Sequence, residues 1–310
     1  EFLCKKIEMM IKEKMINKKE ICILTRNLSD HYCNRLINKL SEVNIEARVE
    51  NTYQDLLRED IVKIILSIIK LAVAKSSPDE WVFIVNLLKK INGYSAYTKS
   101  EKINSLEKNI SGYLRKLNDG LCKVRTKEEL EEIINSIISY LGIQHLKSLY
   151  IQYKKGNYID KTIENFLNLF WENYNVNKNW NNAIERFKGE YTIPIMSIHK
   201  SKGLEFNTVI LLGVEGSAFW GIKEKPTEEL CNFFVAASRA KENLFFTYSA
   251  KRIIKGKVKF GQKNDVKLFY DLMKRSQIVQ FYNLIDDFEQ GYSDYYSTTM
   301  DMVVAGNVKE

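Results

Sequence analysis

The chain has 310 residues, of which 45% are hydrophobic, 28% charged and 12% aromatic, a globular composition that excludes a disordered or collagen-like chain. No window approaches the roughly 18 uninterrupted apolar residues of a membrane span, so we expect no membrane partner. The formal net charge of +8 fits either a lysine-rich soluble protein or a partner of polyanions such as nucleic acid.

The cysteines and histidines give little sign of a metal or disulfide framework. The five cysteines are odd in number and show no CxxC spacing, which predicts a reducing, cytoplasmic location. Three histidines are too few for a histidine-rich site, so we expect no metal ligands on this chain. The N-terminus has neither an initiator Met nor the apolar core of a secretory signal, as expected of a fragment or a processed piece.

The first 91 residues predict alternating helices and strands. In chain order these are a helix over 1–14, a strand over 20–25, a helix from Ser29, a strand over 44–49 and a helix over 56–74. The last of these is apolar on most sides, so we expect it to be buried. Ser77, followed by Pro78 and Glu80, predicts another helix start with Ser77 as its N-cap.

Residues 92–188 predict an all-helical unit. Apolar residues recur at helical spacing over 103–117, 130–141 and 163–174, with no strand-like alternation between them. Thr126 and Glu129 form a capping box before the second stretch. Phe170 and Trp171 in the third are better explained as core residues than as base-stacking platforms.

Strands return after Gly189. In chain order, we expect a strand over 191–198, a strand over 208–212, a helix over 227–241 with Phe234 and Val235 inward, and a strand over 244–248. Short apolar strands that alternate with helices predict an α/β fold with a parallel sheet covered on both faces. We therefore expect one α/β domain built from 1–91 and 189–275, an all-helical insertion over 92–188, and a C-terminal tail over 276–310 that is acidic and tyrosine-rich from Asp286.

One polar segment, residues 197–206, lies between two predicted strands. Its sequence, SIHKSKGLEF, places a hydroxyl, an imidazole, ammonium groups and a carboxylate around one glycine. Loops at the carboxyl ends of parallel strands bind ligands in α/β sheets, and this mixture of groups suits phosphates and sugar hydroxyls. The alternative is a solvated polar turn.

Two arginines are candidates for contact with an anion. Arg26 follows the first strand, and Arg239 lies in a helix whose small residues allow close approach to a partner. We expect both arginines and the 197–205 loop on one edge of the sheet, where two guanidinium groups facing one anion would suit phosphoryl transfer. The alternative for each is an ordinary surface arginine.

The sequence contains no GxxxxGK[ST] phosphate-binding loop. No strand ends in an acidic pair suited to Mg²⁺, since Asp79 and Glu80 are better explained by a helix start and Asp286 and Asp287 lie in the tail. Candidate arginine fingers without a nucleotide cradle indicate one half of a two-part ATPase. A basic run over 251–263 predicts a solvated hairpin or loop, with contact to DNA phosphates as the alternative.

Three segments resemble motifs of superfamily 1 helicases of the UvrD, Rep and PcrA type. Residues 24–27 (LTRN) resemble motif IV, 197–206 resemble motif V with KGLEF intact, and 234–240 (FVAASRA) resemble motif VI. They occur in the family order, with the helical insertion between motifs IV and V. The chain departs from the family pattern at three positions: Thr25 stands where the family usually has Tyr, Ser238 where it has Thr, and Asn207 where it often has Pro. Its helical insertion is also short for a 2B domain.

The resemblance implies a RecA-like motor domain, 2A, interrupted by a 2B insertion, in the C-terminal half of an ATP-dependent 3′–5′ DNA helicase or translocase. By the same resemblance, ATP would lie between this half and an N-terminal 1A/1B half that carries the P-loop and the Mg²⁺ ligands. The residue roles it implies are catalytic contact with the γ-phosphate for Arg239 and Arg26, ATP binding for Gly203, Glu205 and Lys202, and DNA binding for Ser197, His199 and Lys200. Lys202 would contact either ATP or DNA.

The partners implied are single-stranded DNA or a 3′-tailed duplex, the 1A/1B half, and a nuclease subunit in some relatives. DNA repair and anti-phage defence both use such proteins, and the sequence does not choose between them. The fragment alone is expected not to hydrolyse ATP. The alternative function is a non-catalytic module, derived from such a helicase, that binds DNA or a nuclease partner without turnover.

Overall fold

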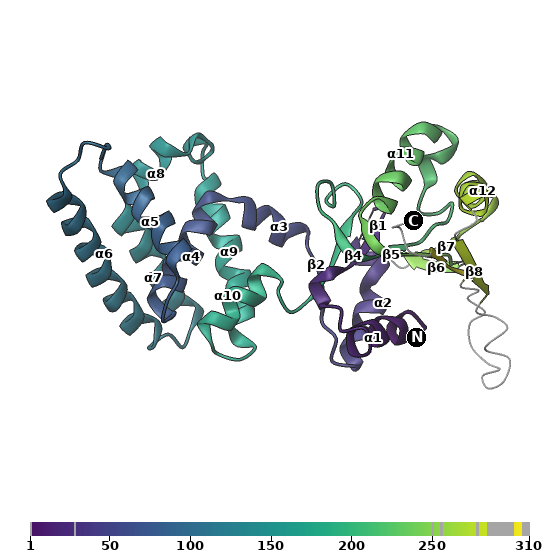
Figure 1. Ribbon diagram of the computed structural model, residues 1–310, viewed down its shortest axis with the longest axis horizontal. Coiled ribbons are helices and arrows are strands. Elements are labelled where there is room, and N and C mark those ends of the chain that lie inside the picture. Colours follow the sequence, from purple (N-terminus) through teal and green to yellow (C-terminus); the bar gives the residue numbers. More distant parts are fainter. Residues whose placement is uncertain are drawn as a thin grey trace. The chain divides into compact units, whose positions relative to one another are not determined.

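The computed structural model describes residues 2–27, 29–249, 251–254, 257–276, 279–283 and 301–305. The chain divides into two compact units (Figure 1). The first joins Glu1–Asn51 to Gly189–Glu310 and the second is Thr52–Lys188, and each has its own cluster of buried apolar side chains. None of the helices in the described ranges is both long and apolar enough to cross a membrane.

The first unit is built on a seven-stranded sheet of order β2–β3–β1–β4–β5–β9–β8. The strands are β1 (Ile21–Thr25), β2 (Ala47–Val49), β3 (Ile193–Ser197), β4 (Phe206–Leu212), β5 (Ala240–Thr247), β8 (Val279–Asn283) and β9 (Asp301–Ala305). The strands β2, β3, β1, β4 and β5 run parallel to one another. Strand β9 is antiparallel to β5 and to β8. The α/β class with a parallel sheet is thus confirmed.

Apolar runs account for the central strands. All five residues of β1 (ICILT) are buried, as are six of the seven in β4, because helices cover both faces of the sheet. Helices α1 and α2 lie on one face, and α11 and α12 on the other (Figure 1). Their bounds, with those of the short 3₁₀ helices of this unit, are α1 (Phe2–Lys12), α2 (Ser29–Glu42), α11 (Pro226–Ala237), α12 (Lys267–Ser276), η1 (Lys18–Glu20), η3 (Trp220–Lys223) and η4 (Asn264–Val266).

The segment expected as a tail, 276–310, contributes two strands to the sheet. Strand β9 adds to the free edge of β5, with Leu244 level with Ala305, and β8 adds to β9. Backbone pairing at a sheet edge needs no regular side-chain pattern, so these two strands could not be predicted from the pattern of residues. Residues 284–300, which include Asp286 and Asp287, lie outside the described residues.

The second unit consists of helices. They are α3 (Asn51–Arg58), α4 (Asp60–Val73), α5 (Pro78–Ile91), α6 (Ser100–Leu121), α7 (Lys127–Leu141), α8 (Ile143–Leu149), η2 (Ile151–Lys154), α9 (Tyr158–Asn175) and α10 (Trp180–Lys188). Helix α4 is the centre of this unit: seven of its residues are buried, and it packs against α5, α6, α7, α9 and α10. Its nearly continuous apolar sequence, DIVKIILSIIKLAV, matches this position.

Polar contacts fix several ends of these helices. The predicted capping box is present, since the Thr126 N–H donates to Glu129 Oε2 (3.0 Å) and the Glu129 N–H donates to Thr126 Oγ1 (3.3 Å). Ser77 precedes α5 as predicted, but its hydroxyl donates to the Ser76 carbonyl and makes no cap. Tyr153 accepts from the Ile61 N–H at the start of α4 and donates to Glu59. Burial raises the pKa of this phenol, so it remains a donor.

The boundary between the units differs from the one expected from the sequence. Helices α3, α4 and α5 belong to the helical unit, so the first boundary lies between Asn51 and Thr52 and not between 91 and 92. The second boundary, at Gly189, falls where expected, and Gly189 has a left-handed φ of +87°. Helical periodicity shows that a segment is a helix but not which core it joins, and this explains the difference.

These boundaries predict which fragment folds alone. Residues 52–188 should give a soluble helical domain with one cooperative thermal transition, whereas 92–188 should not, because it lacks α4. Seven buried apolar side chains, at about 1.5 kcal/mol or more each, are worth roughly 10 kcal/mol, comparable with the whole stability of a domain, about 5–15 kcal/mol. Circular dichroism melts of both fragments test this, and a sharp transition in 92–188 would contradict it.

Candidate nucleotide and DNA site

The parallel register fixes the carboxyl edge of the sheet. Thr25, the last residue of β1, is level with Ser197 at the end of β3 and with Leu212 at the end of β4. Arg26 follows Thr25 directly, and His199 lies two residues after Ser197. Arg26 and the first half of the motif V loop therefore lie at the carboxyl edge.

The same register places the other candidates at the amino edge. Phe206, the first residue of β4, is level with Ala240, the first residue of β5, and its N–H donates to the Arg239 carbonyl (2.9 Å). Glu205 directly precedes Phe206. Because β3 and β4 are parallel, residues 198–205 must cross the sheet from one edge to the other.

The first half of this crossing is a tight turn. The Lys200 N–H donates to the Ser197 carbonyl (3.0 Å) and to the Ser197 hydroxyl (3.4 Å), while the buried Ser201 hydroxyl donates to the Ile198 carbonyl (2.7 Å). The His199 side chain is exposed and that of Lys200 is half-buried. The turn is thus anchored by its own polar groups and presents an imidazole and an ammonium group.

The second half is open to solvent. Lys202, Gly203, Leu204 and Glu205 are all exposed. Gly203 has a left-handed φ of +81°, and a Cβ built there would meet nothing within 4 Å. The backbone at this point is therefore free for close approach by a ligand, and glycine allows the required conformation.

Arg239 is held beside this open backbone. Its Nη1 donates to the Leu204 carbonyl (3.1 Å), its Nε to the Val235 carbonyl (3.1 Å) and its Nη2 to the Ser238 hydroxyl (3.0 Å). The structure therefore brings Arg239 together with the Gly203–Glu205 stretch, as the sequence predicted. The side chain stays half-buried at the end of α11.

Arg26 does not join Arg239, contrary to the expectation of a shared edge. It forms a bidentate pair with Glu229 in the first turn of α11, through Nε and Oε2 (2.6 Å) and through Nη2 and Oε1 (3.0 Å). This hydrogen bond to Glu229 raises the pKa of Arg26. The two arginines lie at opposite ends of α11, because a strand's end and the end of a returning helix fall on opposite edges of a sheet.

Helix α11 also differs from the prediction in the face that it buries. Phe234, expected inward, is 71% exposed, and its neighbour Phe233 is buried against Phe246 and Phe269 with ring centroids 5.2 and 4.5 Å away. Consecutive helical positions differ by about 100° around the axis, so a shift of one residue moves a side chain from core to solvent. The sequence analysis did not identify Glu229, because its partner Arg26 lies 203 residues away in the chain.

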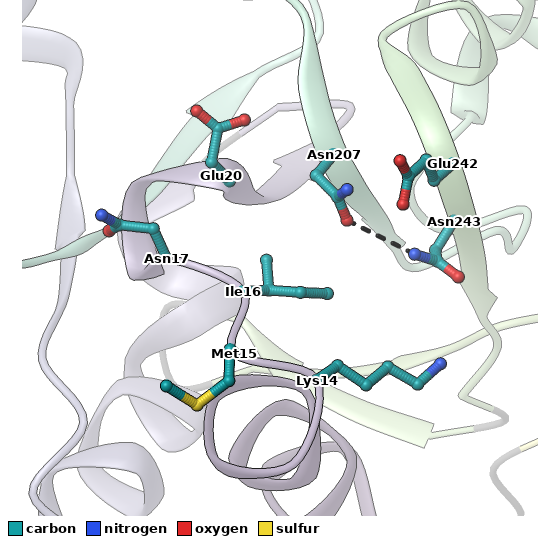
Figure 2. A pocket seen from close by; sticks show the side chains of 8 residues that line it. All are labelled: Lys14, Met15, Ile16, Asn17, Glu20, Asn207, Glu242 and Asn243. Atoms are coloured by element: carbon teal, nitrogen blue, oxygen red, sulfur yellow. Dashed lines mark hydrogen bonds between the residues drawn. The ribbon is translucent and has the colours of Figure 1, made fainter.

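A separate hollow of ≈ 410 Å³ lies at the amino edge, on the α1 side of the sheet (Figure 2). Its walls are Lys14, Met15, Ile16, Asn17, Glu20, Asn207, Glu242 and Asn243. The Asn243 amide donates to Asn207 Oδ1 (3.4 Å), so these two residues form a polar wall of the hollow. Sequence reasoning gave no sign of this hollow, because its residues come from distant segments.

The basic run forms a hairpin of β6 (Lys251–Ile254) and β7 (Lys257–Phe260). All four residues of β7 are exposed, as expected of a solvated hairpin, while contact of the hairpin with DNA stays a prediction. Lys255 lies outside the described residues. Over the described ranges, no group of three or more His, Cys, Asp or Glu side chains is placed to hold a metal ion.

Comparison with known proteins shows which family the chain resembles. Residues 79–251, more than half of the chain, match the family described as the UvrD-like helicase C-terminal domain. The chain is 36% identical to the ATP-dependent DNA helicase Rep of Buchnera aphidicola subsp. Schizaphis graminum over 75 residues, 23% of this chain and 11% of that protein. It is 35% identical to the putative ATP-dependent DNA helicase YjcD of Bacillus subtilis over 98 residues, 28% of this chain and 12% of that protein.

The matches thus span about a tenth of the length of these two relatives. The parallel sheet, with helices on both faces, is consistent with the RecA-like fold expected of this family. Because the family match covers more than half of the chain, the chain belongs to the UvrD-like helicase C-terminal domain family.

Proposed function

We propose that this chain is the C-terminal part of an ATP-dependent 3′–5′ DNA helicase or translocase, and that it completes an ATP site whose P-loop lies on a 1A/1B half outside this sequence. The observation that carries the proposal is the contact between Arg239 and the Leu204 carbonyl, beside Gly203 and Glu205. It places an arginine, an open backbone and a carboxylate at one edge of the sheet in a member of a helicase family.

The residues at the amino edge suit ATP. A guanidinium has more N–H donors than the three bonds of Arg239 use, so donors remain for the γ-phosphate. Glu205 can accept from the ribose hydroxyls, Gly203 leaves room for the nucleotide, and Lys202 adds a mobile ammonium group. Mg²⁺ bound to the triphosphate would neutralise its charge, with ligands from the P-loop half.

The residues at the carboxyl edge suit a DNA strand. Ser197, His199 and Lys200 offer a hydroxyl, an imidazole and an ammonium group, which contact phosphates without reading the bases. One crossing loop then carries DNA contacts at its start and nucleotide contacts at its end. In this proposal the partners are the 1A/1B half and either single-stranded DNA or a 3′-tailed duplex. A nuclease subunit is a further partner if the protein acts in DNA repair or in anti-phage defence, both of which place it in the cytoplasm.

The helical unit Thr52–Lys188 is the 2B insertion in this proposal, and Glu1–Asn51 with Gly189–Glu310 is the 2A motor domain. The family of the chain and the insertion of an all-helical unit between motifs IV and V support this assignment. The insertion follows β2, the strand at the edge of the sheet, and precedes β3, the strand next to it. The central strands of the motor domain are therefore not interrupted by the insertion.

The isolated 310-residue chain should show no ATP turnover above buffer, with or without single-stranded DNA, because it has no P-loop. A coupled-enzyme ATPase assay on purified chain measures this, with the Arg239→Ala variant as the control for contaminating ATPases. Turnover that disappears in Arg239→Ala would show a complete ATP site on this chain and would overturn the half-site proposal.

Arg239→Ala in the complete protein should lower kcat for ATP by about 10³-fold or more, the scale of an arginine finger. ATP binding should weaken much less, and Arg239→Lys should recover little, since lysine lacks the planar fork. The matched control is Lys241→Ala, which removes an exposed cation two residues away and should leave kcat unchanged. Wild-type turnover in Arg239→Ala would remove the finger assignment.

His199→Ala in the complete protein should reduce DNA-stimulated ATPase more than basal ATPase, because the imidazole lies at the edge assigned to DNA. The variant should lose affinity to a similar extent for two single-stranded oligonucleotides of unrelated sequence. The affinity of the wild-type protein for both should fall steeply as the salt concentration rises. Fluorescence anisotropy with two oligonucleotides checks this, with His145→Ala in the helical unit as control. Equal loss of basal and stimulated rates would instead assign His199 to the fold or to the nucleotide.

A further inference from the structure

The end of helix α11 carries a small polar cluster that holds the guanidinium group of Arg239. The helix ends at Ala237, and Ser238 is its C-cap. In a continuing helix the Arg239 N–H would donate to the Val235 carbonyl, but it donates to the Ala236 carbonyl instead (3.3 Å). Two side chains take its place, since Arg239 Nε (3.1 Å) and the Ser238 hydroxyl (3.0 Å) both donate to the Val235 carbonyl.

The Ser238 hydroxyl joins the end of the helix to the arginine. Its oxygen accepts from Arg239 Nη2 (3.0 Å), while its hydrogen is directed at the Val235 carbonyl. Both roles are fixed, because a carbonyl oxygen can only accept and a guanidinium can only donate. The hydroxyl is therefore held in one orientation, although the Ser238 side chain is exposed to solvent.

The three bonds of the Arg239 side chain use one N–H on each of its nitrogens. Nε donates to the Val235 carbonyl, Nη1 to the Leu204 carbonyl (3.1 Å) and Nη2 to the Ser238 hydroxyl. A guanidinium has five N–H groups, so two have no partner in the described part of the chain, one on Nη1 and one on Nη2. Bonds to three acceptors around a planar group fix its plane, and the plane sets the direction of these two donors. A pair of such donors on neighbouring nitrogens suits a phosphate.

We propose that Ser238 is a positioning residue for Arg239, and that its hydroxyl fixes the Nη2 side of the guanidinium so that the two remaining N–H groups point at the γ-phosphate. Without this hydroxyl, the guanidinium keeps its bonds through Nε and Nη1 but loses the acceptor that fixes Nη2. An arginine side chain has many rotamers, so the loss of one anchor lowers the share of time that it spends in the productive geometry. This proposal rests on the proposed role of Arg239 in ATP turnover.

The test compares threonine with valine at position 238, because these two side chains have nearly the same shape and differ in the hydroxyl. In the complete protein, Ser238→Val should lower kcat for ATP by about 10-fold or more, the scale of one hydrogen bond to a charged group, with little change in KM. Ser238→Thr should keep most of the wild-type rate. Thr227→Val removes an exposed hydroxyl from the first turn of the same helix and is the matched control, with the wild-type rate expected. Equal rates in Ser238→Thr and Ser238→Val would overturn the proposal.

A second measurement separates positioning from a role in the fold or in direct contact with ATP. In an Arg239→Ala background, Ser238→Val should cause no further loss of turnover, because the group that the hydroxyl positions is gone. A further loss in that background would contradict the proposal. The Ser238→Thr and Ser238→Val forms of the 310-residue chain should also melt at similar temperatures. A difference in kcat that only follows a loss of folded protein at the assay temperature would be structural and would equally count against positioning.

Failure of the proposed function would give a different set of results. Wild-type turnover in Arg239→Ala would remove the finger assignment, and the positioning role of Ser238 would fall with it. If Arg239→Ala lowers kcat as expected while Ser238→Val keeps the wild-type rate, the proposed function stands and only the role of Ser238 is wrong.

Discussion

The parallel pairing of β3, β1 and β4 is the constraint on which the rest of the site depends. Thr25, Ser197 and Leu212 end level with one another, so whatever follows them gathers at one edge. Each parallel strand must then be reached by a connection that returns across the sheet. The motif V loop and α11 are two such connections, and both end at the amino edge beside Arg239.

These two connections meet at the amino edge and are joined there by a hydrogen bond. The loop delivers the Leu204 carbonyl and the helix delivers the Arg239 guanidinium, and one hydrogen bond joins them. At the opposite edge, the loop begins at Ser197 and the helix begins beside Arg26. Two short segments of the chain therefore connect the carboxyl edge to the amino edge: the eight loop residues 198–205 and helix α11.

The helical unit is organised around a buried central helix and not around a sheet. Its central helix, α4, is too apolar for a surface position, and α5, α6, α7, α9 and α10 pack around it. Polar groups at its start are satisfied by Tyr153, which bridges the Ile61 N–H and Glu59. A core of this kind is independent of the sheet, in keeping with the separate buried clusters of the two units.

The sequence by itself determined the local features. Apolar runs gave β1, β3 and β4 because a strand buried on both faces must be apolar, and the Thr126–Glu129 capping box formed because its partners are three residues apart. The motif segments placed Arg239 with Gly203 and Glu205, since the contact joins two segments that belong to one family pattern.

Only the tertiary structure decided which core α3, α4 and α5 join, and which partner Arg26 takes. Both depend on contacts between segments distant in the chain, and the partner of Arg26 lies 203 residues away. The exposure of Phe234 was decided in the same way, because the helix turned to bury Phe233 against two aromatic rings. Periodicity identifies an element, whereas packing selects its neighbours and the face that it buries.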